Sequence, residues 1–215
     1  MNRKQTIFFP SKTPRITLKL LFITVFKRDL NRYHDIKSMK LEIGCGPNKK
    51  KGFYGIDLFN YPGVDKIVDV DSGIPFKDNS VKEIYTAHVL EHVRKFEFVI
   101  EEIYRVCAPN AKITIKVPYF SGKSAFFEFH RRFFRYDSFT DFEQTKESML
   151  STQNPVNFKV IKRKLIFLKK WYLPWNYIVE PFLNLNKKLC LFYEETFLRN
   201  LFPAYEVKFE LKVIK

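Results

Sequence analysis

Two glycines one residue apart are the first residues whose types and spacing could support binding chemistry. Gly44 and Gly46 directly follow the apolar run 39–43, which has the length of a buried strand. Glycine has no Cβ, so its backbone can turn sharply at positive φ and let a ligand approach closely. Open α/β sheets bind nucleotide-like ligands where strands end in such turns. The pattern therefore predicts a ligand at this turn without saying which ligand.

Acidic side chains recur beside the glycines and at the ends of the next predicted strands. Glu42 lies two residues before the first glycine, Asp57 ends the second predicted strand, and Asp69 and Asp71 end the third. A carboxylate is an acceptor with two oxygens, suited to hydroxyl and amino groups of a ligand. Because ligands bind outside the carboxyl ends of parallel strands, we expect these acids near the glycine turn.

Two histidines and a glutamate follow the fourth predicted strand. His88 and His92 are spaced i,i+4 with Glu91 between them, a spacing that can hold a metal ion on a helix. The metalloprotease motif requires glutamate directly after the first histidine, and Val89 stands there. We therefore expect no metal site and interpret these residues as the rim of a ligand pocket. The alternative is that Glu91 and His92 make only local hydrogen bonds at a helix N-terminus.

The segment 118–150 is rich in aromatic rings and arginine and follows the fifth predicted strand. Loops at this edge of a sheet carry function more often than the strands do, so we interpret the segment as a substrate lid. His130 is the candidate general base, because histidine accepts a proton near neutral pH. The alternative is a core of phenylalanines with His130 as a structural donor. The candidate acceptor-contacting residues are Tyr119, Phe120, Arg131 and Arg132.

The elements that must position these residues are strands alternating with connections, which indicates a mostly parallel sheet. Apolar residues at i, i+3, i+4 and i+7 from Phe96 to Val106 predict a helix that ends at Pro109-Asn110. A second helix is expected over 189–201, after an irregular aromatic connection at 171–186. The predicted strands are 39–43, 53–57, 66–69, 81–87, 111–117, 158–168 and 205–214.

The ordered series of motifs resembles the class I S-adenosylmethionine-dependent methyltransferases, in particular their small-molecule, type 11-like branch. Ile74 to Val81 resembles that branch's "LPF-x-D-x-S-F-D" motif, and His88 to His92 resembles "h-x-L-E-H". The likeness covers roughly residues 38–120 and continues faintly through His130 to Phe134 and Phe202 to Ala204. It implies an α/β, Rossmann-like, doubly wound sheet of seven strands, mostly parallel with an antiparallel last strand, in a three-layer α/β/α arrangement.

The resemblance also implies S-adenosylmethionine as the cofactor. The glycines would let the backbone approach its methionyl and ribose parts, and Asp57 would accept from the ribose hydroxyls. A carboxylate at Asp69 or Asp71 would accept from the adenine amino group, and the sequence does not choose between them. The residues expected at the cofactor are Glu42, Gly44, Cys45, Gly46, Asp57, Leu58, Asp69, Val70, Asp71, His88, Val89 and His92.

Two departures separate this turn from the dinucleotide fingerprint. Lys49 stands where a third glycine would be, and Asp57 follows Gly44 by 13 residues, where the fingerprint has about 20. The first crossover helix must therefore be very short or absent. This argues against a dehydrogenase.

Charge and composition favour anionic partners. The net charge is +15, the aromatic content is 17%, and residues 1–40 hold ten Lys/Arg against two Asp/Glu. We therefore expect a basic N-terminal segment, 1–37, before a methyltransferase domain, 38–215. The segment is either an amphipathic helix on an anionic membrane surface or a helix packed on the sheet. Three widely spaced cysteines favour a reducing, cytoplasmic setting, peripheral to the membrane in the first case.

The expected activity is methyl transfer to an oxygen of a small-molecule or glycan- or lipid-linked acceptor. An RNA methyltransferase and a non-catalytic, membrane-peripheral cofactor-binding module remain as alternatives. DNA is disfavoured, because DNA amino-methyltransferases carry an Asp/Asn-Pro-Pro-Tyr-like motif where this chain has His88 to Glu91.

Overall fold

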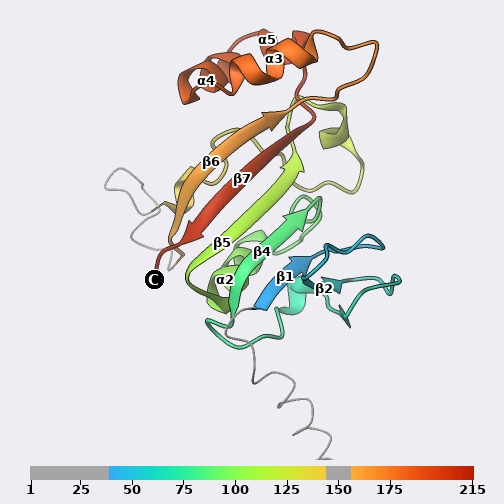
Figure 1. The fold of residues 1–215 in the computed structure, drawn as a ribbon, viewed down its shortest axis with the longest axis vertical. Coiled ribbons are helices and arrows are strands. Elements are labelled where there is room, and N and C mark those ends of the chain that lie inside the picture. The colour runs from blue at the N-terminus through green and yellow to red at the C-terminus, as the bar shows by residue number, and fades with distance from the viewer. Residues whose placement is uncertain (1–38, 144–155) are drawn as a thin grey trace, which may run out of the picture. The chain divides into compact units, whose positions relative to one another are not determined.

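The computed structural model describes residues 39–143 and 156–215. The expected basic segment, 1–37, lies outside the described residues, as does the end of the expected lid, 144–150. The described chain forms one sheet of seven strands in the order β3-β2-β1-β4-β5-β7-β6 (Figure 1). The strands are β1 (Met39–Ile43), β2 (Tyr54–Asp57), β3 (Lys66–Ile67), β4 (Val81–Ala87), β5 (Cys107–Pro118), β6 (Phe158–Ile166) and β7 (Glu206–Val213).

The last strand runs against its neighbours. β7 is antiparallel to both β5 and β6, whereas β1 to β5 pair with one another only in parallel. Parallel strands bring their carboxyl ends to one edge of the sheet, which is where the glycine turn and the loop after β4 lie. The expected α/β sheet with an antiparallel last strand is confirmed.

The two faces of the sheet differ in polarity. Side chains alternate across a strand, and in β7 the buried residues Val207, Phe209, Leu211 and Val213 alternate with charged, partly exposed ones. On the charged face, cross-strand ion pairs join β5 to β7, such as Lys112 with Glu210. Among the described residues no helix covers that face (Figure 1), so this part of the chain supplies one of the two helical layers expected.

Helix α2 (Phe96–Val106) packs on the apolar face. Its buried residues, Phe96, Val99, Ile100, Ile103 and Val106, follow the 3.6-residue period as predicted. The helix ends at Val106 and β5 begins at once, earlier than the Pro109-Asn110 boundary expected from sequence. Pro109 lies instead in the part of β5 where the register with β4 shifts, a place that tolerates a residue without an N–H.

The crossover after β1 is very short. Residues 44–53 contain turns and no helix, as the early Asp57 predicts. Three short 3-10 turns occur elsewhere: η1 (Val70–Ser72), η2 (Lys123–Phe126) and η3 (Thr140–Phe142). The first replaces a longer helix between β3 and β4.

Three short helices gather beyond the carboxyl ends of β5 and β6 (Figure 1). They are α3 (Asn176–Leu183), α4 (Lys187–Glu195) and α5 (Leu198–Leu201). The irregular connection expected at 171–186 is therefore wrong in part, because α3 forms there with Pro181 inside it. The single helix expected over 189–201 is interrupted at Thr196, whose backbone is extended. In the described ranges, no helix combines the length and the apolar composition needed to cross a bilayer.

Candidate functional site

The glycine turn packs against the loop that follows β4. Gly44 has φ +68°, and a Cβ placed on it would lie 2.0 Å from Cγ2 of Val89. Gly44 is thus needed for the packing of the turn as well as for its backbone conformation. Gly46, with φ +53°, has no atom within 4 Å of the place a Cβ would occupy. The second glycine therefore faces open space, as a ligand-facing residue would.

Asp57 ties the end of β2 to this turn. Its Oδ2 accepts from the backbone N–H of Gly46 at 2.8 Å, and its Oδ1 accepts from the N–H of Phe59 at 2.9 Å. Glu42 acts similarly on the other side, accepting from the N–H of Lys50 at 2.6 Å, and burial raises the pKa of Glu42. These carboxylates hold the turn without a crossover helix.

The apolar residues next to Asp57 are exposed. Leu58 and Phe59 keep 55% and 60% of their surface in solvent. Phe59 is in edge contact with Tyr61, their ring centroids 6.0 Å apart. Cys45, by contrast, is buried at the turn, and burial raises the pKa of its thiol. An exposed apolar side chain beside an acidic strand end is suited to cover a flat ring of a ligand.

The structure separates the roles of the two acids after β3. Asp71 is 7% exposed and accepts from the backbone N–H groups of Arg94 and Lys95 and from Nε of Arg94. Burial raises the pKa of Asp71, but these hydrogen bonds outweigh it and hold the pKa below its ordinary value. Asp71 therefore anchors the start of α2. Asp69 is one-third exposed and pairs with Nη2 of Arg94 at 3.0 Å, so it is the more accessible carboxylate.

His88 closes the end of β4 in a left-handed conformation, with φ 56°. Its Nε2 lies 2.9 Å from Oε1 of Glu206, and its Nδ1 lies 3.3 Å from Oε1 of Glu91. The hydrogen bond with Glu206 and then that with Glu91 raise the pKa of His88 to about 9. A non-glycine residue at positive φ costs free energy and occurs mostly where function or packing requires it. His88 is thus a cation held between two carboxylates.

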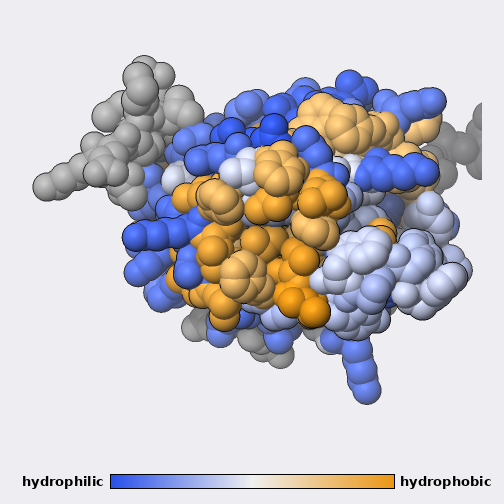
Figure 2. Space-filling view, turned by 90° about the horizontal axis from the view of Figure 1, so that it is seen from above, coloured by the Kyte–Doolittle hydropathy of each residue, from blue (hydrophilic) through white to orange (hydrophobic). Residues whose placement is uncertain are grey.

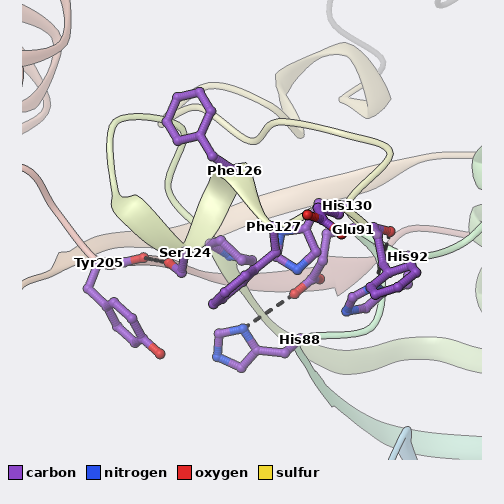
Figure 3. Close-up of a pocket in the computed structure, with 11 residues that line it drawn as sticks. His88, Glu91, His92, Ser124, Phe126, Phe127, His130 and Tyr205 are labelled. Carbon is purple, nitrogen blue, oxygen red and sulfur yellow. Dashed lines mark hydrogen bonds and ion pairs between the residues drawn. The ribbon is translucent and has the colours of Figure 1, made fainter.

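A pocket of about 590 Å³ opens where these residues meet the lid (Figure 3). Its floor is formed by the loop after β4 and the end of β5, and its wall by η2 and the segment after it. Figure 3 shows His88, Glu91, His92 and His130 together on one side, with Ser124 and Tyr205 opposite. The lining residues are His88, Glu91, His92, Pro118, Ser124, Phe126, Phe127, Glu128, Phe129, His130 and Tyr205.

Backbone hydrogen bonds fix the lid above this pocket. The N–H of Arg131 donates to the carbonyl of Glu91 at 2.7 Å, which brings His130 beside His92 with ring centroids 4.6 Å apart. The N–H of Phe120 donates to the carbonyl of Phe134 at 2.9 Å. The predicted lid residue His130 therefore lies in the pocket together with the loop after β4.

Other predicted lid residues lie outside the pocket. Tyr119 is fully buried, and its hydroxyl donates to Oε2 of Glu194 at 2.8 Å. The guanidinium of Arg132 lies over the ring of Phe96 at 4.6 Å. Arg131 is exposed, and Phe120 contacts Arg199 through its ring face. Tyr119 and Arg132 thus position the lid.

Sequence reasoning missed the residues that come from β7 and its approach. Glu206 lies 118 positions from His88, its hydrogen-bond partner, and Tyr205 lies beside Ser124, whose hydroxyl donates to the Tyr205 carbonyl at 3.4 Å (Figure 3). No local pattern connects such distant positions. The sequence predicted the strand at 205–214 but did not place its start at the site.

A protein-family model described as "Methyltransferase domain" matches residues 55–115. That stretch runs from β2 through β5 and includes Asp57, both acids after β3 and the His88 to His92 loop. A comparison with curated proteins finds no significant match.

Solved structures with this fold include an S-adenosylmethionine-dependent methyltransferase of Thermotoga maritima, described as a possible histamine N-methyltransferase. Its sequence is 15% identical and its TM-score is 0.51. The match covers 91% of this chain and 97% of that chain. An S-adenosylmethionine-dependent methyltransferase of Archaeoglobus fulgidus is 13% identical with a TM-score of 0.50, over 90% and 94% of the two chains. At these identities the likeness establishes the fold.

The matched domain and the observed sheet agree on one conclusion. Residues 55–115 hold the family's central strands, and the full sheet has the mixed topology of the same fold. Residues 55–115 thus match a methyltransferase domain, and the described sheet has the fold of S-adenosylmethionine-dependent methyltransferases.

Proposed function

We propose that this methyltransferase modifies an oxygen of a small-molecule or glycan- or lipid-linked acceptor held in the pocket between the β4 loop and the lid. The observation that carries the proposal is the position of that pocket. It lies at the carboxyl ends of β4 and β5, beside the glycine turn. In open α/β sheets a second ligand at this edge lies next to the first.

The residues at the turn fit the cofactor. Gly46 leaves space for close approach, and each oxygen of Asp57 has a free lone pair after its backbone hydrogen bond, enough to accept from two ribose hydroxyls. The exposure of Leu58 supports a role in covering the adenine ring, and the exposure of Asp69 supports a role in accepting from its amino group. The bound cofactor would supply an electrophilic methyl group on a sulfonium. The chain's part is to hold the acceptor in line with it.

The pocket suits an acceptor with an apolar body and a polar end. Phe126, Phe127 and Phe129 supply apolar surface, and His92 and His130 meet beside it, with the Phe127 ring centroid 5.6 Å from that of His130. His130 is 38 positions from His92 in the chain and is presented to the pocket by its hydrogen-bonded loop. We assign His130 and His92 to the acceptor's oxygen, because imidazole can accept its proton near neutral pH.

An apolar surface over α3 to α5 supports an acceptor at a membrane. Figure 2 views the molecule from above, from the end of Figure 1 where these helices lie, and shows apolar side chains gathered into one patch. Exposed apolar patches of this kind are typical of interaction sites. The exposed residues are Trp171, Tyr172, Tyr177, Ile178, Phe182, Leu185, Phe192, Phe197 and Leu201, which we name the apical patch.

Cationic residues border the apical patch. Lys169, Lys170, Lys187 and Lys188 are exposed around it, and blue side chains surround the orange ones in Figure 2. Apolar and aromatic residues within a basic rim favour an anionic lipid surface. Each lysine near such a surface contributes about 1 kcal/mol. This combination favours lipid over RNA, whose binding sites alternate stacking rings with phosphate contacts along a groove.

Transfer of label identifies the acceptor. The purified protein is incubated with methyl-labelled S-adenosylmethionine and with lipid, glycan, small-metabolite and RNA fractions of its own cells. We expect label in a lipid, glycan or small-metabolite fraction, released under conditions that cleave methyl ethers or esters. Label confined to RNA would overturn the acceptor class. Cofactor binding by calorimetry without label in any fraction would favour a non-catalytic module.

A further inference from the structure

Three side chains in the pocket have ligand atoms close enough to share an ion. Glu91, His92 and His130 each present one nitrogen or oxygen atom, and these atoms all lie within 4.8 Å of one another. We propose that Glu91, His92 and His130 bind one divalent first-row transition-metal ion, such as Zn²⁺, at the base of the pocket. Two imidazoles and one carboxylate form a ligand set that suits such ions and leaves coordination positions open.

Glu91 gives the strongest evidence for a metal ion in this cluster. Its side chain is fully buried, and neither carboxylate oxygen accepts a well-oriented hydrogen bond from the described part of the chain. Oε1 has only the 3.3 Å contact with Nδ1 of His88. The His88 cation offsets part of the charge of this buried carboxylate, but Oε2 of Glu91 has no partner among the described residues, which is costly for a buried charge. A metal ion beside Glu91 would compensate this charge.

The two histidines have lone pairs to offer. Nδ1 of His130 is buried and has no hydrogen-bond partner among the residues described. Nδ1 of His92 lies 3.3 Å from the carbonyl oxygen of Phe129. A carbonyl that accepts from Nδ1–H fixes the tautomer in which Nε2 can bind a metal, a common arrangement around metal-binding histidines.

The site requires a modest movement of its side chains. Bonds from four-coordinate Zn²⁺ to nitrogen and oxygen are about 2.0–2.2 Å long, so its ligand atoms lie about 3.3–3.6 Å apart. The ligand atoms lie within 4.8 Å of one another here, so the widest pair must approach by about 1 Å, which small side-chain rotations supply. The hydrogen bond from Arg131 N–H to the Glu91 carbonyl already joins the two segments. His88 is held by its ion pair with Glu206 and contacts the Glu91 carboxylate through Nδ1.

The role of the ion rests on the proposed function. Its open positions would face the pocket, where an acceptor hydroxyl could bind it through oxygen. A divalent ion would lower the pKa of a bound hydroxyl. With His92 and His130 occupied as ligands, the ion would take the place of the imidazole base described above, and the proton would leave to bulk water. This would orient the acceptor oxygen and favour oxygen over nitrogen as the modified atom.

The test measures metal binding without cofactor or acceptor. Tag-free, metal-stripped protein is titrated with Co²⁺, followed by its visible absorption, and then with competing Zn²⁺. We expect one Co²⁺ per chain with an absorption typical of nitrogen and oxygen ligands. His92→Ala and His130→Ala should each weaken binding at least ~100-fold, beyond the effect of losing a supporting residue. Circular dichroism and the unfolding midpoint confirm that each variant is folded.

Glu91 and Glu128 provide a matched pair. Glu128 lines the same pocket but is exposed and lies outside the cluster, so Glu128→Gln should bind Co²⁺ as the wild type does, whereas Glu91→Gln should not. Equal Co²⁺ affinity in wild type, His92→Ala and His130→Ala would overturn the metal site. So would the absence of Co²⁺ and Zn²⁺ binding by the wild type. Metal binding with no labelled product would count against the proposed function alone.

Discussion

Val89 occupies the space that a side chain on Gly44 would need, with its Cγ2 2.0 Å from the place of the missing Cβ. The loop after β4 thus packs directly on the turn after β1. Because the crossover between β1 and β2 has no helix, this contact and the hydrogen bonds of Asp57 hold the turn. The proposed cofactor site is therefore built from packing between two loops.

Gly44→Ala should therefore destabilise the protein strongly. Overpacking costs about 1–3 kcal/mol, and a non-glycine residue at positive φ adds about 1–2 kcal/mol. We expect the free energy of unfolding to fall by ~2–5 kcal/mol, measured by urea unfolding. Adding Val89→Ala should recover the overpacking part only. A double variant no more stable than Gly44→Ala would show that Val89 is not the residue in the way.

Asp57 should be required for cofactor binding. Asp57→Ala removes the proposed acceptor of the ribose hydroxyls. We expect the affinity for S-adenosylmethionine, measured by calorimetry, to fall at least ~100-fold, because about two charge-assisted hydrogen bonds are lost. Asp65→Ala is the matched control. Asp65 also holds this loop, accepting from the N–H of Gly55 at 2.7 Å and pairing with Lys49. Equal losses of affinity in the two variants would mean that loop stability, and not contact with ribose, is what Asp57 contributes.

Asp71 should make the fold sensitive to acid. Its pKa is held below the ordinary value of 3.8, since hydrogen bonds from Arg94 and Lys95 outweigh the opposing effect of burial. The stability it contributes is thus complete above the unfolded pKa and is lost as the pH falls through the lower folded pKa. Asp71→Asn should lower the free energy of unfolding by ~3 kcal/mol at neutral pH, the typical cost of breaking a buried charged contact.

The pH profile distinguishes Asp71 from its neighbour. Urea unfolding between pH 3 and 6 should be less pH-dependent in Asp71→Asn than in the wild type. Asp69→Asn removes a more exposed carboxylate that contacts the same Arg94, so it should change stability by less than about 1 kcal/mol. A larger effect at Asp69 than at Asp71 would contradict the assignment of Asp71 as the anchor of α2.

Much of the sheet was readable from the sequence because periodicity reports burial directly. The alternation in β7 and the 3.6-residue period of α2 both reflect one buried face. Periodicity failed at α3, an eight-residue helix that follows Trp171 and Trp175 and contains Pro181. The boundary at Pro109 was missed for a different reason, since a strand with a register shift tolerates proline as well as a turn does.

The site was only partly predictable. Motif order placed the glycine turn, Asp57 and the His88 to Glu91 loop at one edge of the sheet, because carboxyl ends of parallel strands meet there. It could not distinguish Asp69 from Asp71, which depends on the contacts of Arg94. It also could not bring His130 to Glu91, because that meeting depends on the fold of the lid.

The apical patch should bind anionic membranes through its exposed residues on α3 to α5. Ile178 and Phe197 are 74% and 71% exposed. A negative charge at either position removes apolar contact with the membrane and adds repulsion from the anionic lipids. Ile178→Glu and Phe197→Glu should therefore each lower binding to phosphatidylserine-containing vesicles about tenfold in sedimentation.

Ile161→Glu is the matched control, because Ile161 is 56% exposed on β6 and outside the patch. Binding to neutral vesicles should be weak, and raising the salt should weaken binding to the anionic ones. Equal loss in Ile161→Glu, or binding to RNA that the patch variants do not change, would contradict a lipid-facing role for this surface.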